Sequence, residues 1–143
     1  MGKFKLQTVL NHRERLESLA QQAHAAAQQK ECVLLDRLAE KRLELSKLHE
    51  EFEVQQRLGL SAQEFVLYSN HIDHTLTILA SLVEQWEAAR EELECRRQAL
   101  CKASQERRLL EKLKEKHLLD EQALARHQEA IQLDEIAVQH FKR

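Results

Sequence analysis

The scarcity of chain-breaking residues is the feature that most constrains what this chain can fold into. Its 143 residues contain no proline and only two glycines, at positions 2 and 59. Folds built from many short elements need a turn residue about every ten positions, and this chain cannot supply them. Charged residues make up 32% and aromatic residues 4%, a composition typical of long helices with a narrow buried stripe. The sequence therefore predicts an all-α protein of long helices.

The segment around Gly59 carries four signals of a break between two helices. Gly59 can adopt a positive φ and so end the preceding helix. Ser61 is a favourable N-cap residue, and Glu64 lies three positions later, which is the spacing of a capping box. Leu60 and Phe65 flank this cap at the positions of a hydrophobic staple. We therefore expect a hinge at about 58–61, with Gly59, Ser61 and Glu64 as its key residues.

Two helices are expected on either side of the hinge, at about 4–57 and about 62–141. In both, apolar residues recur at spacings of mostly three, four or seven, as one helix face requires. The first stripe comprises Val9, Leu16, Ala20, Ala23, Ala27, Leu34, Leu38, Leu45, Leu48 and Phe52. The second comprises Ile72, Leu76, Leu79, Val83, Trp86, Arg90, Leu93, Arg97 and Leu100, then, after a shift of three positions, Ala103, Leu110, Leu113, His117, Leu124, His127, Ile131, Val138 and Phe141.

A short connection makes two consecutive helices antiparallel neighbours. Folding the chain at the hinge places Phe4 opposite roughly residue 115, and at 1.5 Å per residue the helices measure about 80 and 120 Å. We therefore expect residues 1–143 to form a single antiparallel coiled-coil hairpin whose second helix is longer. About 25 residues at its end should overhang the paired region. Their apolar stripe lacks an intrachain partner, which indicates contact with another chain.

Charge is distributed unevenly along this hairpin although the net charge is only −2. Residues 1–30 and 96–119 carry +3 and +5, so pairing them gives the open end +8. Residues 31–58 and 59–95 carry −2 and −6, which gives the hinge half −8. Such polarity can orient the protein on a partner. The alternative is that these charges only solvate the helix faces.

The helix that follows the hinge is more apolar than a coiled-coil seam requires. A second stripe, Leu67, His71, Thr75, Ile78 and Leu82, runs beside the seam and indicates a partner surface. A wider interface with the first helix explains the same stripe equally well.

The sequence argues against an enzyme and against bound cofactors. Glycines at positions 2 and 59 alone cannot form a phosphate-binding loop, and a two-helix rod offers no enclosed pocket for shifting carboxyl pKa values. His49, His71 and His74 come together on folding, but we expect no metal site from histidines on exposed helices. We expect no small-molecule substrate either.

Cysteine usage and the remaining segments predict a cytoplasmic protein that has no membrane span of its own and does not bind nucleic acid. Cys32, Cys95 and Cys101 have no metal or redox spacing, which suits a reducing compartment. The chain begins without an apolar signal segment and contains no run of about 18 apolar residues. The basic stretch near residues 95–117 interleaves acids and lacks stacking aromatics, so nucleic-acid binding is not expected.

Three stretches resemble the FliJ family, the coiled-coil component of the flagellar type III export apparatus. They are FKLQTVLNHRERLE near the start, EFVLYSNHIDHTL after the hinge, and ERRLLEKLKEKH followed by LDEIAVQHF late in the chain. The matching residues are Phe4, Leu6, Val9, Leu10 and Arg13; Tyr68, Ile72 and Leu76; and Arg107, Leu110, Glu111, Lys112, Leu113, Asp134, Glu135 and Ile136. The order and spacing of the stretches carry the resemblance, together with chain length and two-helix organisation.

The resemblance implies a non-enzymatic, stalk-like protein at the inner face of the cell membrane. Family members are thought to insert into the ring of the export ATPase, to promote its assembly and activity, and to link it to the membrane export gate and to export chaperones. On this basis the residues expected to dock into the ATPase are Arg107, Arg108, Lys112, Lys114 and Lys116. Those expected to contact the gate are Tyr68, His71, Thr75, Ile78 and Leu82. The alternatives are the equivalent stalk of a virulence secretion system and a generic coiled-coil scaffold.

Overall fold

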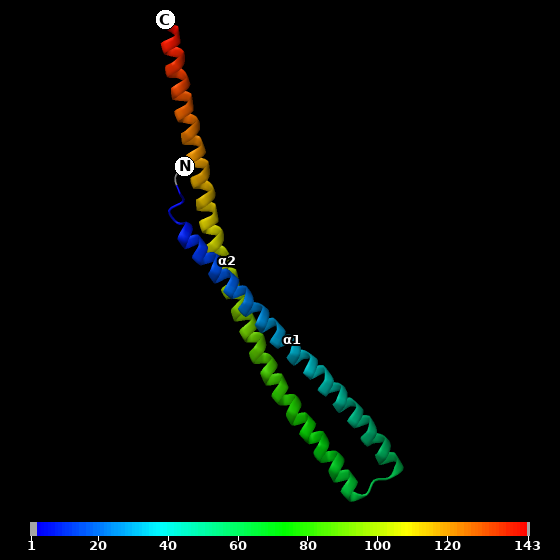
Figure 1. Ribbon diagram of the computed structural model, residues 1–143. Helices are drawn as coiled ribbons and strands as arrows, with labels where there is room; N and C mark the ends of the chain where they lie inside the picture. Colours follow the sequence, from blue (N-terminus) through cyan, green and yellow to red (C-terminus); the bar gives the residue numbers. More distant parts are fainter. Residues whose placement is uncertain (1–2, 143) are drawn as a thin grey trace. The chain divides into compact units, whose positions relative to one another are not determined.

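Two α-helices account for nearly all of the chain in the computed structural model, which describes residues 3–142. Helix α1 spans Gln7–Leu58 and helix α2 spans Ala62–Phe141 (Figure 1). The predicted all-α fold with two helices that pack on each other is confirmed. Helix α1 begins three residues later than expected, whereas the bounds of α2 coincide with the expected ones. Residues 1, 2 and 143 of the predicted hairpin lie outside the described part.

The break between the helices has the expected cap. Gly59 adopts a φ of +100°, a backbone conformation that other residues rarely take. The Ser61 Oγ accepts a hydrogen bond of 3.2 Å from the backbone N–H of Glu64. The backbone N–H of Phe65 donates to the Ser61 carbonyl at 3.0 Å, which forms the first turn of α2. The chain therefore ends one helix and begins the next within the three residues from Gly59 to Ser61.

The chain divides into two units that we describe separately: a hairpin unit, Gln21–Gln98, and a terminal unit, Met1–Ala20 with Ala99–Arg143. The hairpin unit contains the loop and the arms of α1 and α2 that flank it (Figure 1). Its core consists of buried Leu34, Leu38, Leu82 and Ala89, with Ile78, Leu79, Val83 and Trp86 packed against them. Near the loop, the ring of Phe52 lies 5.5 Å from that of Phe65 and 5.4 Å from that of Tyr68. The two arms therefore run antiparallel and pack through one narrow seam.

The seam of α2 differs from the predicted one at every second position. Thr75, Leu82 and Ala89 are 2%, 9% and 2% exposed, whereas Leu76 is 45% exposed. The buried positions are thus shifted by one residue from Leu76, Val83 and Arg90, and Arg90 lies on the surface. The prediction that Arg90 and Arg97 occupy the seam is wrong, because the small side chains of Thr75 and Ala89 allow closer helix packing and leave the arginines in solvent. The Thr75 hydroxyl donates to the His71 carbonyl at 2.9 Å, which satisfies it within the helix.

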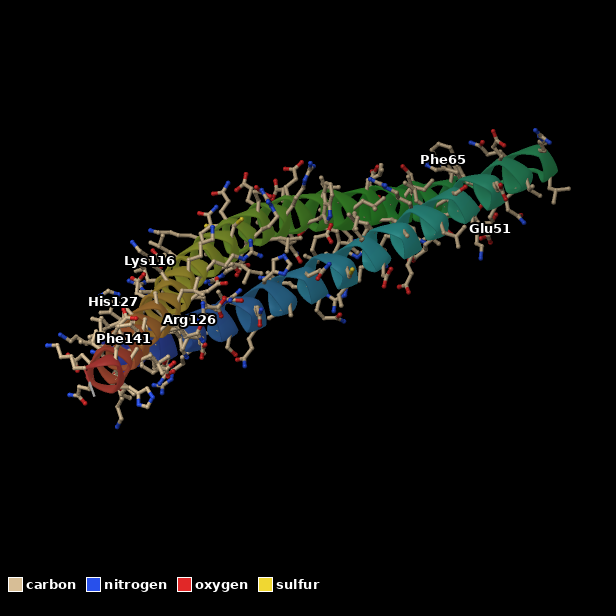
Figure 2. The ribbon with its side chains drawn as sticks, turned by 90° about the horizontal axis from the view of Figure 1, so that it is seen from above. Glu51, Phe65, Lys116, Arg126, His127 and Phe141 are labelled. Atoms are coloured by element: carbon tan, nitrogen blue, oxygen red, sulfur yellow. The ribbon has the colours of Figure 1, made fainter. Side chains whose placement is uncertain are left out.

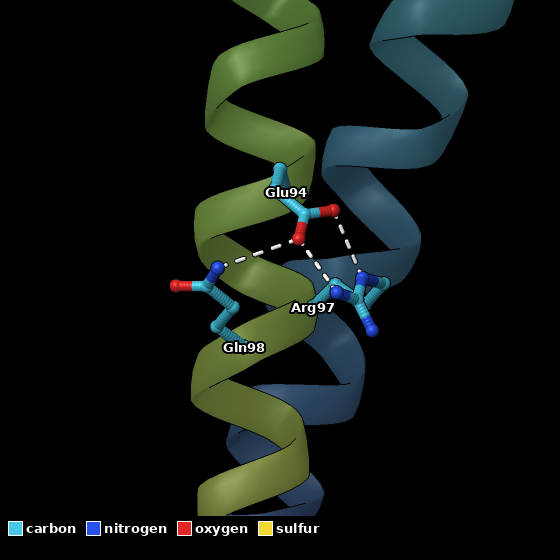
Figure 3. Close-up of polar contacts among 3 residues, drawn as sticks. All are labelled: Glu94, Arg97 and Gln98. Atoms are coloured by element: carbon cyan, nitrogen blue, oxygen red, sulfur yellow. Dashed lines mark hydrogen bonds and ion pairs between the residues drawn. The ribbon is translucent and has the colours of Figure 1, made fainter.

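Both arginines find partners on their own helix. The guanidinium of Arg90 lies 5.5 Å from the centre of the Trp86 ring. Arg97 donates to Glu94 through Nε at 2.9 Å and Nη2 at 2.6 Å, and Gln98 donates to the same carboxylate at 3.4 Å (Figure 3). The hydrogen bond from Arg97 lowers the pKa of Glu94. These contacts are exposed, so we expect them to contribute little to stability.

In the terminal unit the start of α1 packs against α2 in the same antiparallel sense. Leu10 is 2% exposed, Arg13 Nη1 lies 2.7 Å from Glu106 Oε2, and the ring of Phe4 lies 5.7 Å from that of His117. Every described residue from 122 to 142 is exposed. The longer second helix therefore overhangs, as predicted. Neither helix has, in its described residues, an apolar stretch that would cross a membrane.

We predict that Gly59→Ala lowers the free energy of unfolding by about 1–2 kcal/mol, because an L-residue is strained at positive φ. No atom lies within 4 Å of the position that the new Cβ would take, so the cost is backbone strain and not a clash. Urea denaturation followed by circular dichroism measures this change in the free energy of unfolding. Gly59→Asn should cost less, because asparagine tolerates this conformation better than alanine. Equal stabilities of all three proteins would contradict the prediction.

Candidate partner-binding surfaces

Four of the five residues expected to dock into an ATPase are exposed on α2 in the terminal unit. Arg108, Lys112 and Lys116 are spaced four positions apart, so they form one stripe along the helix, which we call the basic stripe. Figure 2 shows Lys116 projecting from α2. Lys114 is also exposed but lies on a different side of the helix. The basic stripe is available to an acidic partner surface.

Arg107, the fifth predicted residue, is used inside the terminal unit. Its Nε donates a hydrogen bond to the carboxylate of Glu17 on α1, and its Nη1 lies 2.7 Å from Glu111 Oε2 on α2. The side chain is only 21% exposed. The hydrogen bond to Glu17 raises the pKa of Arg107 above its ordinary value, and the hydrogen bond to Glu111 makes a smaller contribution in the same direction. Sequence reasoning missed Glu17, because an ion pair between helices depends on their stagger.

The stripe expected to contact the gate does not form a continuous exposed surface. Thr75 and Leu82 are buried in the seam against α1, and Ile78 packs on the hairpin core. Tyr68 is half-buried and only His71 is fully exposed. The sequence offered two explanations of this stripe, a partner surface or a wider interface with the first helix. The second explanation describes the position of the buried residues.

Tyr68 lies at the boundary between core and surface near the loop. Its hydroxyl donates to Glu51 Oε1 at 3.1 Å, across from α2 to α1. Partial desolvation, together with the hydrogen bond to Glu51, raises the pKa of Tyr68. Figure 2 labels Glu51 and Phe65 in this part of the hairpin unit. Tyr68 therefore helps to connect α2 to α1 within the hairpin unit.

An apolar surface near the loop combines Leu67, which belongs to the second stripe expected from the sequence, with Val54 and Leu58, which sequence reasoning missed. Val54, Leu58 and Leu67 are 50%, 75% and 69% exposed. Val54 and Leu58 lie outside the predicted stripes, so helical periodicity gave no signal for them. Helix α2 carries no lysine or arginine before Arg90, so on the α2 side the charged neighbours of this surface are acidic.

The histidines and cysteines are distributed along both helices. Within the described part of the chain, no group of three or more His, Cys, Asp or Glu side chains is placed to hold a metal ion. Cys32, Cys95 and Cys101 are free thiols on the surface.

The fold and its exposed charged faces define a two-helix antiparallel coiled coil. The family model described as flagellar FliJ protein matches residues 2–143, essentially the whole chain. The chain therefore belongs to the FliJ family, whose members are structural components of the flagellar protein export apparatus. No curated protein and no solved structure matches the chain significantly.

We predict that Arg107→Gln loosens the start of α1, because it removes the cation that Glu17 and Glu111 share. Amide hydrogen exchange in residues 10–20 should accelerate by roughly a few-fold, as expected for easier local opening. The matched control is Arg108→Gln, which alters an exposed neighbour and should leave exchange unchanged. Equal exchange in both variants would show that the ion pair does not hold the segment.

Proposed function

We propose that this protein is a stalk-like component of the flagellar export apparatus that docks into the ring of the export ATPase. In this role it promotes assembly and activity of the ring and links it to the export gate and to export chaperones at the inner face of the cell membrane. The family match over residues 2–143 is the observation that carries the proposal.

The basic stripe is the contact we assign to the ATPase ring. Arg108, Lys112 and Lys116 are exposed, and none of them has an ion-pair partner among the described residues. Lys114 can add a fourth charge from the neighbouring side of the helix. Arg107 acts indirectly, because it holds the start of α1 on α2. An acidic ring surface would be attracted to the stripe and guided in orientation.

The overhang supplies the apolar part of this contact. Ile131, Val138 and Phe141 are 45%, 53% and 93% exposed, although their side chains are of the kind that proteins bury. Figure 2 shows Arg126, His127 and Phe141 projecting from this part of α2. A single helix with exposed apolar residues gains stability when a partner covers them.

The gate and the chaperones are assigned to the hairpin unit. His71 and the accessible edge of Tyr68 remain available, and the exposed apolar residues Val54, Leu58 and Leu67 lie in the same unit. Thr75, Ile78 and Leu82 support this surface from the seam. The acidic surroundings favour a partner segment with basic side chains.

We expect Arg108→Glu/Lys112→Glu to weaken binding to the export ATPase by roughly ten- to a hundredfold at low salt, because attraction becomes repulsion. The matched control is Arg42→Glu/Lys47→Glu, which makes the same charge change at exposed positions of the hairpin unit. Binding can be measured by surface plasmon resonance and by co-elution on gel filtration. Both variants should retain wild-type helicity.

Two results would contradict the docking proposal. One is unchanged affinity of the Arg108→Glu/Lys112→Glu protein. The other is an equal loss in the control, which would mean that net charge and not the basic stripe determines binding. Raising the salt concentration should reduce the difference between the two variants, because exposed charges are screened.

A further inference from the structure

A groove in the terminal unit is not used by the basic stripe. It lies between the start of the chain and α2 and has a volume of about 440 Å³. Phe4, Leu10 and Leu118 form its apolar lining. Leu10 is buried, whereas Leu118 is 50% exposed. Apolar surface is therefore open to a partner here.

The rim of this groove is acidic although the surrounding helix is rich in lysine and arginine. Its charged and titratable lining residues are Glu14, Glu111, Lys114, Glu115, His117 and Glu121. Among the described residues, neither Glu14 nor Glu115 has a cationic partner. Glu14 comes from α1 and Glu115 from α2, so two uncompensated carboxylates stand on the two helices that form the groove.

His117 adds a polar group with unused hydrogen-bonding capacity. Its Nε2 atom is buried and makes no hydrogen bond. Glu121 Oε1 lies 3.3 Å from it, close enough for an ion pair but without hydrogen-bond alignment. The ring of Phe4 lies 5.7 Å from the ring of His117. The groove lining therefore contains a buried imidazole nitrogen without a hydrogen-bond partner in the isolated chain.

We propose that the groove receives an arginine or lysine side chain that a partner protein presents beside an apolar side chain. The cation would lie between Glu14 and Glu115, and its aliphatic stem with the apolar neighbour would contact Phe4 and Leu118. Arginine fits best, because its planar guanidinium donates in several directions at once. An acidic segment or an anionic lipid would be repelled by the rim.

The groove and the basic stripe face different directions on α2. At about 100° per residue, the basic stripe of Arg108, Lys112 and Lys116 is displaced by roughly a quarter of a turn from Glu111, Glu115 and Leu118. A partner that surrounds this helix would need acidic groups toward the stripe and a basic, apolar anchor toward the groove. The groove proposal does not depend on the proposed function, because it can be tested on this chain alone.

The test titrates the ¹⁵N-labelled full chain with the peptide acetyl-Leu-Arg-Leu-amide and follows backbone amide shifts by NMR. The matched probe is the same peptide with citrulline, which keeps the shape of arginine and removes its charge. We expect saturable shifts confined to residues 4–14 and 111–121 with the arginine peptide. Binding of the citrulline peptide should be at least about fivefold weaker, as expected when two partly exposed ion pairs are lost.

Two variants locate the site. Glu14→Gln and Glu115→Gln should each weaken arginine-peptide binding by about threefold, whereas Glu129→Gln, an exposed carboxylate of the overhang, should not. Glutamine is a good helix former, so helicity should be preserved. Equal binding of the two peptides, shifts elsewhere in the chain, or an equal effect of Glu129→Gln would overturn the proposal.

Discussion

The packing of two amphipathic helices through one narrow seam is the interaction on which the rest of this structure depends. Neither helix can bury its apolar stripe alone, and long helices in water gain most of their stability from such packing. In the hairpin unit Leu34 and Leu38 of α1 meet Leu82 and Ala89 of α2. The glycine at position 59 makes this meeting possible, because it reverses the chain within three residues. The charged faces on both sides of the seam are then free for partners.

The two units differ in the contacts that hold α1 against α2. The hairpin unit has a cluster of buried aliphatic residues, whereas the paired part of the terminal unit contains one fully buried leucine, Leu10, among its described residues and relies on Arg13–Glu106 and Arg107–Glu17. Polar contacts at partly exposed positions stabilise less than aliphatic burial. We therefore expect the terminal unit to open more easily. This is also the unit that carries the basic stripe, the acidic groove and the overhang, and a segment that opens readily can adapt to a partner.

Much of the fold could be predicted from the sequence, because it depends on local signals. Gly59, Ser61 and Glu64 locate the hinge, and the absence of proline extends the helices to nearly their observed ends. The register of the seam could not be predicted in the same way. Helical periodicity favours Leu76 and Val83 by hydrophobicity, whereas packing buries Thr75, Leu82 and Ala89. The small side chains of Thr75 and Ala89 let the helices approach. The role of Arg107 was missed for a related reason, since its pairing with Glu17 requires the stagger between helices to be known.

The most direct test of this account measures whether α1 and α2 run side by side in the hairpin unit. After replacing the three cysteines with serine, nitroxide labels at positions 43 and 77, both exposed, report one distance by double electron–electron resonance. Antiparallel helices packed at 8–10 Å predict a separation of roughly 15–30 Å between the labels. One continuous helix would place these positions about 50 Å apart at 1.5 Å per residue, and that result would contradict the account.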